Sequence, residues 1–317
     1  MRKHWGFALC LALAALLISG CSAPAKKTLT IAEQFGIAYA PLQVMKQEGT
    51  LEKALPGVTI QWVQMGGPTA IREGMLAGQI DVGFMGIGPM LIGVDTGMAW
   101  KCFTALSANE VAFITNRADV HSLADLGEKD RIAILSPGST QHILLCMAAE
   151  QQLGRADALD QRLVSLSHPD AMSAMLAGGE VALHVATPPY TDLERANGMH
   201  SILTGTEVVG GPFTFICGVA STALHDERRL VYDALQQCLQ AAVAEINADL
   251  PAAAKRLAPL YGVAEDTLLA EMTYQGSIYQ TELHGVEPFA QAMARLGLLS
   301  AAPQSEAFAF DDVEVLP

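Results

Sequence analysis

Five consecutive residues, Ser136-Pro137-Gly138-Ser139-Thr140, could hold a small polar or anionic group. They follow a short apolar run and open a helical pattern. Gly138 allows a close backbone approach, Ser139 is a favourable N-cap residue, and Thr140 adds a second hydroxyl. A helix N-terminus offers unpaired N–H groups and a partial positive charge, which suit an anion. We therefore expect ligand contact here, and the alternative is that Ser139 only caps its own helix.

Other candidate contacts lie where predicted strands end, which is where open α/β sheets bind ligands. Gly86 and Gly88, on either side of Ile87, offer backbone N–H donors to a ligand. A tight turn that contacts no ligand explains these glycines nearly as well. Phe35 could equally be a core residue. The full set of expected ligand contacts comprises Gln34, Phe35, Gly36, Tyr39, Gly86, Ile87, Gly88, Asn109, Gly138, Ser139, Thr140, Thr187, Pro188 and Phe213.

The histidines do not indicate an enzyme. They show no metal-ligand spacing and no paired nucleophile, and the chain has no HExxH, CxxC, GxSxG or P-loop pattern. His142 falls in the first helical turn after Ser139 and could reach the cleft, where the helix dipole disfavours its charged form. His184, between two apolar residues of a predicted strand, is expected to be a buried, hydrogen-bonded histidine. We predict no catalytic residue, no metal and no cofactor.

Short apolar runs alternate with helical patterns, which is typical of an α/β protein with largely parallel sheets. Two sheets are expected. Strands are predicted at 29–32, 58–65, 80–85, 101–107, 111–116, 132–135, 163–166, 181–186 and 214–219, and helices at 41–55, 69–77, 89–94, 140–153 and 170–177. A later long helix should present Leu235, Leu239, Ala242 and Ile246 on one face.

An internal repeat supports two related lobes. Met75-Leu76-Ala77-Gly78 recurs 100 positions later as Met175-Leu176-Ala177-Gly178, and each copy should end a helix that leads into a strand. A proline-containing turn follows the strand in both copies. Chance similarity of one tetrapeptide is the alternative.

The N-terminus is typical of an export signal. Arg2 and Lys3 precede an apolar run from Phe7 to Ile18, which is too short for the roughly 20 residues of a membrane-spanning helix. Residues 18–21, Ile-Ser-Gly-Cys, resemble the bacterial lipobox, in which the cysteine is lipidated after cleavage. We expect a lipoprotein signal peptide at 1–20, lipid on Cys21 and a short tether at 21–27. An ordinary signal peptide or a short anchor helix are the alternatives.

Composition and charge narrow the classes of protein. Loss of Arg2 and Lys3 leaves 17 basic against 33 acidic residues, a formal charge of −16, which makes nucleic acid an unsuitable partner. With 51% hydrophobic and 16% charged residues the chain is not disordered. The remaining cysteines, Cys102, Cys146, Cys217 and Cys238, lie in apolar stretches typical of buried thiols, and whether any of them pair stays open.

The sequence resembles the extracytoplasmic substrate-binding proteins of ABC importers, in the nitrate, sulfonate and taurine group that also includes pyrimidine-precursor binders. No single motif is decisive, but their order and spacing are specific over nearly all of 28–299. The segments that carry the resemblance are the lipobox, 36–42 (GIAYAPL) with Glu48-Gly49, 76–83 (LAGQIDVG), 122–127 (SLADLG), Gly138-Ser139, 176–178 (LAG) and 293–299 (MARLGLL).

The resemblance implies a two-lobed periplasmic-binding-protein fold of type II, with two mostly parallel sheets flanked by helices and a double hinge. Lobe 1 would comprise 28–112 and 213–317, and lobe 2 would comprise 113–212. A monomer anchored to the membrane through the lipid on Cys21 would bind a small anionic or heteroaromatic nutrient and deliver it to a permease driven by a cytoplasmic ATPase.

Two departures from the family pattern weaken any transfer of ligand identity. Thr187-Pro188-Pro189 lacks the carboxylate that many relatives carry before the proline, and residues 180–184, EVALH, lack an aspartate that often follows the preceding turn. A same-fold biosynthetic enzyme, or a lipoprotein that senses a ligand without transporting it, are the alternative functions, because a fold does not determine a function.

Overall fold

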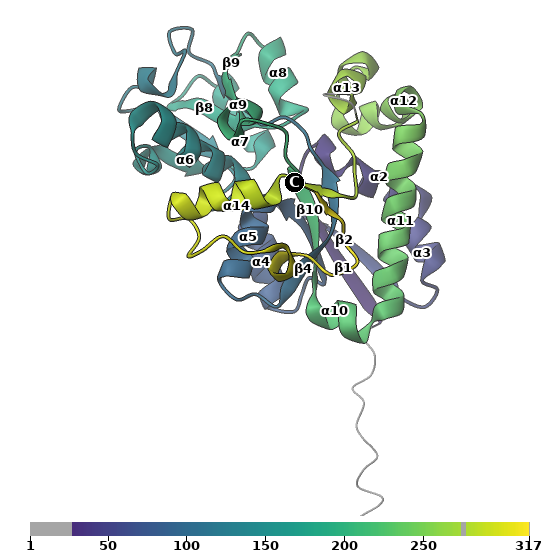
Figure 1. Ribbon diagram of the computed structural model, residues 1–317. Coiled ribbons are helices and arrows are strands. Elements are labelled where there is room, and N and C mark those ends of the chain that lie inside the picture. The colour runs from purple at the N-terminus through teal and green to yellow at the C-terminus, as the bar shows by residue number, and fades with distance from the viewer. Residues whose placement is uncertain (1–26, 274–276, 317) are drawn as a thin grey trace, which may run out of the picture.

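The computed structural model describes residues 27–273 and 277–316 and shows two lobes, each built on a five-stranded sheet (Figure 1). Cys21, where we expect the lipid, and the expected signal peptide at 1–20 lie outside the described residues. The first sheet has the order β2-β1-β3-β10-β4, and the second has the order β7-β6-β8-β5-β9. No helix in the described part of the chain is both long and apolar enough to span a membrane.

Each sheet has four strands in one direction and one reversed strand. In the first sheet β10 is antiparallel to both neighbours, and in the second β5 is. The first sheet comprises β1 (Thr28–Glu33), β2 (Thr59–Gln64), β3 (Val82–Gly86), β4 (Trp100–Ser107) and β10 (Ile216–Ser221). The second comprises β5 (Ala112–Thr115), β6 (Arg131–Ile134), β7 (Leu163–Ser165), β8 (Val181–Ala186) and β9 (His200–Thr204). The two expected, mostly parallel sheets are confirmed.

Helices cover both sides of the first sheet, with α4 and α5 opposite α2, α3 and α11 (Figure 1). Their bounds are η2 (Ile37–Tyr39), α2 (Ala40–Glu48), α3 (Thr50–Ala54), α4 (Pro68–Leu76), α5 (Ile87–Asp95), α10 (Thr222–Glu227) and α11 (Arg229–Ala248). The helix predicted at 41–55 is two helices, because Gly49 is left-handed (φ 58°) and ends α2. All four apolar residues expected on one face of α11 are buried.

The second sheet carries η3 (Leu123–Asp125), α6 (Thr140–Leu153), η4 (Asp160–Arg162), α7 (His168–Leu176), α8 (Tyr190–Ala196) and α9 (Gly205–Val209). The repeated tetrapeptide ends α4 in one lobe and α7 in the other, and both Gly78 and Gly178 have φ of 67°. The helix–glycine–strand unit is therefore the same in both lobes.

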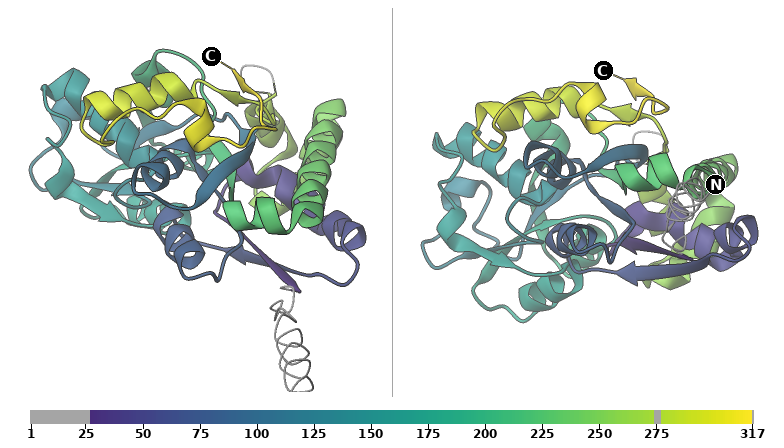
Figure 2. Two further views of the ribbon diagram at one scale, coloured as in Figure 1. Left: turned by 60° about the horizontal axis from the view of Figure 1, so that its bottom comes forward. Right: turned by 90° about the horizontal axis from the view of Figure 1, so that it is seen from below.

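The C-terminal segment, yellow in Figure 2, runs along one side of the molecule. This segment contains α14 (Val286–Arg295), α15 (Ser305–Phe308) and a small parallel sheet of β11 (Leu283–His284) and β12 (Val315–Leu316). It is preceded by α12 (Leu250–Tyr261) and α13 (Glu265–Met272), which are green in the same figure. Phe289 of α14 stacks on Phe213 at a centroid distance of 5.3 Å, beside the point where the chain returns to the first sheet.

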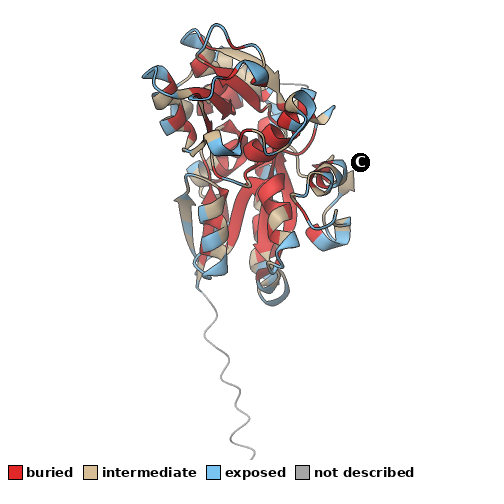
Figure 3. Ribbon diagram, turned by 90° about the vertical axis from the view of Figure 1, so that its left-hand side faces the viewer, coloured by how far each residue is buried: buried red, intermediate tan, exposed pale blue. Residues whose placement is uncertain are grey.

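The core lies on the faces of both sheets, where buried strands run through the centre of each lobe (Figure 3). Phe84 of β3 and Phe103 of β4 meet edge to face across Gly218 of β10, where a Cβ atom would lie 2.6 to 2.7 Å from their rings. Glycine is thus required at this point of the sheet. The four cysteines of the described chain are free thiols.

Candidate functional site

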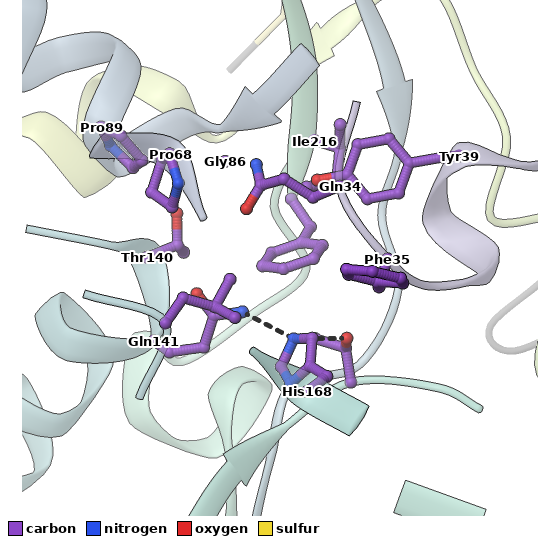
Figure 4. Close-up of a pocket in the computed structure, with 13 residues that line it drawn as sticks. Gln34, Phe35, Tyr39, Pro68, Gly86, Pro89, Thr140, Gln141, His168 and Ile216 are labelled. Atoms are coloured by element: carbon purple, nitrogen blue, oxygen red, sulfur yellow. Dashed lines mark hydrogen bonds between the residues drawn. The ribbon is translucent and has the colours of Figure 1, made fainter. Parts of the chain in front are cut away.

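A cavity lies between the lobes, where strands of both sheets end (Figure 4). Gln34 follows β1, Gly86 ends β3, Leu135 follows β6 and Thr187 follows β8. The complete lining is Gln34, Phe35, Tyr39, Pro68, Gly86, Pro89, Leu135, Thr140, Gln141, His168, Thr187, Phe215 and Ile216. Both lobes therefore contribute to one site at the position that α/β sheets use for ligands.

The two lobes touch directly around this cavity. The backbone N–H of Gly88 donates to Thr140 Oγ1 at 3.3 Å, and the N–H of Ile37 donates to the carbonyl of Pro188 at 3.2 Å. A Cβ atom on Gly86 would lie only 2.0 Å from Thr140 Oγ1. The enclosed space is about 10 Å³, room for roughly one water molecule. This is a closed arrangement, and a larger ligand requires the lobes to move apart.

The polar part of the lining is uncharged. Gln34 Nε2 donates to the carbonyl of Phe84 at 3.3 Å, whereas its Oε1 is buried and has no partner among the described residues. Thr140 and Gln141 form the first turn of α6, with at most 2% of either residue exposed. The N-terminus of this 14-residue helix thus faces the cavity together with two side chains that can donate.

A chain of three buried side chains leads from the cavity into the second lobe. His168 Nδ1 lies 2.9 Å from His184 Nε2, and His184 Nδ1 lies 2.6 Å from Glu194 Oε1. The other ring nitrogen of His168, Nε2, lies 3.2 Å from Thr187 Oγ1 and 3.4 Å from Gln141 Nε2. All three residues of the chain are at most 2% exposed. The expected role of His184 as a buried, hydrogen-bonded histidine agrees with this position.

Burial disfavours charge on each member of this chain. It lowers the pKa of His184 to about 3 and the pKa of His168 well below its usual value, where the neighbouring His184 adds to the effect. It raises the pKa of Glu194 to about 8, although the positive charge of Arg195 opposes the shift. The three groups are therefore most stable when each is neutral.

An outer recess of about 280 Å³ adjoins the cavity and shares Gln34 and Phe35 with it. Tyr190 of α8 and Tyr261 of α12 line this recess, and burial raises the pKa of both phenols. The Tyr261 hydroxyl has no partner within the described chain. The recess gives the site aromatic walls and a second buried polar atom.

The structure brings together many of the residues expected from the sequence. Gln34, Phe35, Tyr39, Gly86, Thr140 and Thr187 line the cavity. Gly36 lines the outer recess, and Pro188 and Gly88 join the lobes through their backbone groups. Ile87 is buried beside the cavity, with its N–H donating to the carbonyl of Phe215.

Four other expected contacts lie outside the cavity lining. Ser139 Oγ accepts from the N–H of His142 and so caps α6, and Gly138 donates its N–H to His142 Nδ1 at 3.0 Å. Phe213 packs on α14. Asn109 is buried at the crossing from β4 to β5, and neither atom of its side-chain amide has a partner among the described residues.

The most informative residue that the sequence analysis missed is His168. The internal repeat could have found it, because an offset of 100 positions relates Pro68, at the start of α4, to His168, at the start of α7. Both residues line the cavity. Gln141, Leu135, Pro89, Phe215 and Ile216 were also missed.

A cluster of His142, Cys146 and Asp160 has ligand types that suit a metal, but its hydrogen bonds do not fit one. The N–H of Gly138 donates to His142 Nδ1, so in the neutral ring the proton is on Nε2. Nε2 is the atom that faces Asp160 at 3.6 Å and Cys146 at 3.5 Å, and a metal there would need its lone pair. We assign this cluster a structural role.

Comparisons with known proteins agree with the expected periplasmic-binding-protein fold. A family model described as the NMT1-like family matches residues 22–260. The alkanesulfonate-binding protein SsuA from Xanthomonas axonopodis pv. citri, solved bound to MOPS, superposes with a TM-score of 0.71 at 22% identity, covering 89% of this chain and 96% of its own. The periplasmic aliphatic sulphonate binding protein SsuA from Escherichia coli superposes with a TM-score of 0.66 at 19% identity, and the match covers 90% of this chain and 98% of that protein. A search of curated proteins found no match.

Proposed function

Because the chain belongs to the NMT1-like family, we propose that it is the substrate-binding component of an ABC importer. It binds a small anionic or heteroaromatic nutrient between its two lobes and delivers the nutrient to a permease. Lobe 1, at 28–112 and 213–317, and lobe 2, at 113–212, close on the ligand as two bodies joined by two crossings. The likeness to proteins named for alkanesulfonates favours a sulfonate as the first ligand class to test.

The observation that carries this proposal is the buried, uncharged polar lining at the lobe interface. Gln34 Oε1 has no partner in the described chain, and Thr140 and Gln141 stand at the start of α6. An unpaired buried polar atom costs free energy unless a ligand or water satisfies it. The unpaired Gln34 Oε1 is an acceptor, so it would take an N–H or O–H group of the ligand. Because the whole protein is strongly negative, the charge of an anion must instead be held by local donors, namely the Thr140 hydroxyl, the Gln141 amide and the first N–H groups of α6.

The proposed cellular location follows from the N-terminal segment. Cleavage before Cys21 and lipidation of its thiol would hold the protein at the extracytoplasmic face of a membrane, as a monomer beside its permease. One lipidated cysteine with several acyl chains anchors more firmly than a single myristoyl chain. The binding domain would then be tethered through 21–27.

A thermal-shift screen tests the proposal directly. Protein starting at Ser22 is unfolded and refolded to remove carried-over ligand, then heated with sulfonates, nitrate, bicarbonate, carboxylates, pyrimidines and thiamine precursors. A ligand at 100 times its Kd adds about 2.7 kcal/mol to the free energy of unfolding. We expect one class to raise Tm, and calorimetry then gives its Kd. If no compound raises Tm, the proposed function is wrong for these ligand classes.

A further inference from the structure

We infer that Glu194, His184 and His168 form a proton relay that sets whether the cavity receives a hydrogen-bond donor or an acceptor from His168 Nε2. This inference rests on the proposed function, because it concerns how the same cavity selects and releases its ligand. The distances of 2.9 and 2.6 Å along the chain are those of direct hydrogen bonds. The relay links the cavity to a carboxyl group that no solvent reaches.

Two protonation states give every hydrogen bond of the relay one donor and one acceptor. In the first, Glu194 is ionised and accepts from His184 Nδ1–H, and His168 Nδ1–H donates to His184 Nε2. His168 Nε2 is then an acceptor, which fits the amide nitrogen of Gln141 at 3.4 Å and the hydroxyl of Thr187 at 3.2 Å. Each ring is neutral, and the relay as a whole carries one negative charge.

The second state contains one more proton. A proton binds His168 Nε2 from the cavity, the Nδ1–H proton of His168 moves to His184 Nε2, and the Nδ1–H proton of His184 moves to Glu194 Oε1. Each ring thus gains a proton on Nε2 and loses one from Nδ1, and the carboxylate of Glu194 takes up the last proton. The relay is then neutral, and the Nε2–H group of His168 is a donor that faces Thr187 and Gln141. The side-chain amide of Gln141 must turn its oxygen toward the ring to accept from it.

The second state suits an anionic ligand. A neutral donor at the cavity wall can bind an oxyanion, whereas an acceptor with a buried negative charge behind it repels one. Full burial of the carboxyl favours the same neutral state, as the raised pKa of Glu194 also indicates. Binding of an anion should therefore keep the proton on the relay, and loss of the proton should favour release.

Few other titratable groups face the relay. The Tyr190 ring stacks on His168 at a centroid distance of 5.4 Å, and Tyr39 lines the cavity from the first lobe. Burial raises the pKa of both phenols, so both stay neutral near pH 8. The positive charge of Arg195 opposes the effect of burial on the pKa of Glu194.

Charged groups on the neighbouring elements have other partners. Asp170 of α7 accepts from the hydroxyl of Ser167, and Arg131 of β6 lies 4.0 Å from Glu180. The Nε2 atom of His200 on β9 binds a backbone carbonyl, and β5 contributes no titratable side chain. Burial and the nearby Asp192 also raise the pKa of Glu271 on α13 to about 8, and Arg195 opposes that shift as well. The proton balance at His168 Nε2 should still be set by the three relay residues, because direct hydrogen bonds connect them to it.

The first test needs neither a variant nor a ligand. Two-bond ¹H–¹⁵N spectra of histidine-labelled protein report which ring nitrogen carries the proton. We expect His168 and His184 to be protonated at Nε2 at pH 6.5 and at Nδ1 at pH 10. A proton on Nδ1 of His168 at pH 6.5, or the same tautomer throughout, would overturn the relay.

A conservative variant and a matched control identify the carboxyl group. The Glu194→Gln amide can donate to His184 Nδ1 but cannot ionise, so both rings should stay protonated at Nε2 up to pH 10. Glu271→Gln is the control, because burial and the nearby Asp192 raise the pKa of Glu271 to about 8 as well, outside the relay. Glu271→Gln should show the same change of tautomer as the wild type. If the change is lost in Glu271→Gln, the carboxyl group that controls the tautomers is Glu271 and not Glu194.

Calorimetry with ethanesulfonate, whose charge is constant from pH 6.5 to 9.5, separates the relay from the proposed function. In amine buffers free of sulfonic acids, we expect affinity to fall roughly 30-fold over this range, since above the pKa of about 8 each pH unit costs about tenfold. Glu194→Gln should show a change of less than about twofold. Equal pH dependence in the two proteins would overturn the relay while leaving the binding function intact. No binding at any pH, with the tautomer change still present, would instead overturn the proposed sulfonate function.

Discussion

Ser139 and Thr140 are adjacent in the sequence but have different roles in the structure. Ser139 Oγ accepts the N–H of His142 within α6, whereas Thr140 Oγ1 accepts the N–H of Gly88 from the other lobe. A cap stabilises the helix that carries it, and a bond between lobes stabilises closure. Removal of the Ser139 hydroxyl should therefore affect mainly stability, and removal of the Thr140 hydroxyl should affect mainly ligand binding.

Single substitutions test this separation. Ser139→Ala should lower the free energy of unfolding by about 1 kcal/mol, the usual value of an N-cap, and change ligand affinity less than about twofold. Thr140→Val keeps the side-chain shape but leaves the Gly88 N–H unpaired, which costs about 1–3 kcal/mol and should weaken binding roughly tenfold. Denaturant titration and calorimetry measure the two quantities. Weakened binding in Ser139→Ala alone would reverse the assignment.

The raised pKa of Glu194 also predicts how the free energy of unfolding changes with pH. Its value is raised to about 8 in the folded protein from 4.5 as the ordinary value, so between these pH values the folded state holds a proton that the unfolded state has lost. The contribution of the protonated Glu194 to the free energy of unfolding is present at low pH. It is lost as the pH rises toward 8, by at most about 1.4 kcal/mol per pH unit.

Glu194→Gln should therefore become more stable relative to wild type as pH rises from 5 to 8, with no further gain above pH 8. Urea unfolding at one-unit intervals measures the difference. The buried histidines act in the opposite direction, since their lowered pKa values make the fold lose stability as pH falls from about 6.5 toward 3. A constant difference between the two proteins from pH 5 to 8 would show that Glu194 is already ionised in the fold.

At the scale of elements, closure depends on how near β3 comes to α6. Gly86 ends β3 in an ordinary extended conformation (φ −64°), so alanine is allowed by the backbone there. The obstacle is Thr140 Oγ1, 2.0 Å from the position of a Cβ atom, in the opposite lobe. A methyl group at this position should leave each lobe folded and hold the lobes apart.

Gly86→Ala tests this directly. Overpacking of this kind costs about 1–3 kcal/mol, which corresponds to roughly 5- to 150-fold in affinity. Small-angle scattering should show less compaction when the ligand is added, with Tm of the free protein unchanged within a few degrees. Gly179→Ala is the control, because no atom lies within 4 Å of its Cβ position. Normal affinity in Gly86→Ala would mean that productive closure does not require this contact.

At the scale of the whole molecule, one large apolar cluster contains residues of both lobes in the closed arrangement, and a smaller cluster lies around β5 and β8. The proposed lipid would hold both lobes at a membrane. The tether at 21–27 would separate the folded domain from that membrane. The proposed attachment would depend on a single thiol, so one substitution would remove the anchor without changing the folded domain.

Cys21→Ser should abolish incorporation of labelled palmitate and move the protein from the membrane to the soluble fraction. Ligand affinity should be unchanged, because Cys21 precedes the first strand by several residues. Labelling and fractionation of cells that express each form provide the measurement, with Cys238→Ser as a matched control for loss of a thiol. Continued labelling of Cys21→Ser would place the lipid elsewhere.

The sequence by itself determined the local elements and their repetition. The bounds predicted for α6 and β8 agree with the structure, and the repeated tetrapeptide ends α4 and α7 as expected. Caps, glycine turns and hydrophobic periodicity depend on residues within a few positions of one another. The short, half-buried strand β9 was missed, because burial does not alternate along its residues.

Only the tertiary structure decided which side chains face the ligand. Phe213 turned toward Phe289 of α14, 76 positions away, and left Phe215 to line the cavity. Glu194 and His168, 26 positions apart on different helices, met through His184 on a strand between them. Such contacts depend on how distant elements pack and exclude water, and the burial that shifts their pKa values exists only after the lobes have formed.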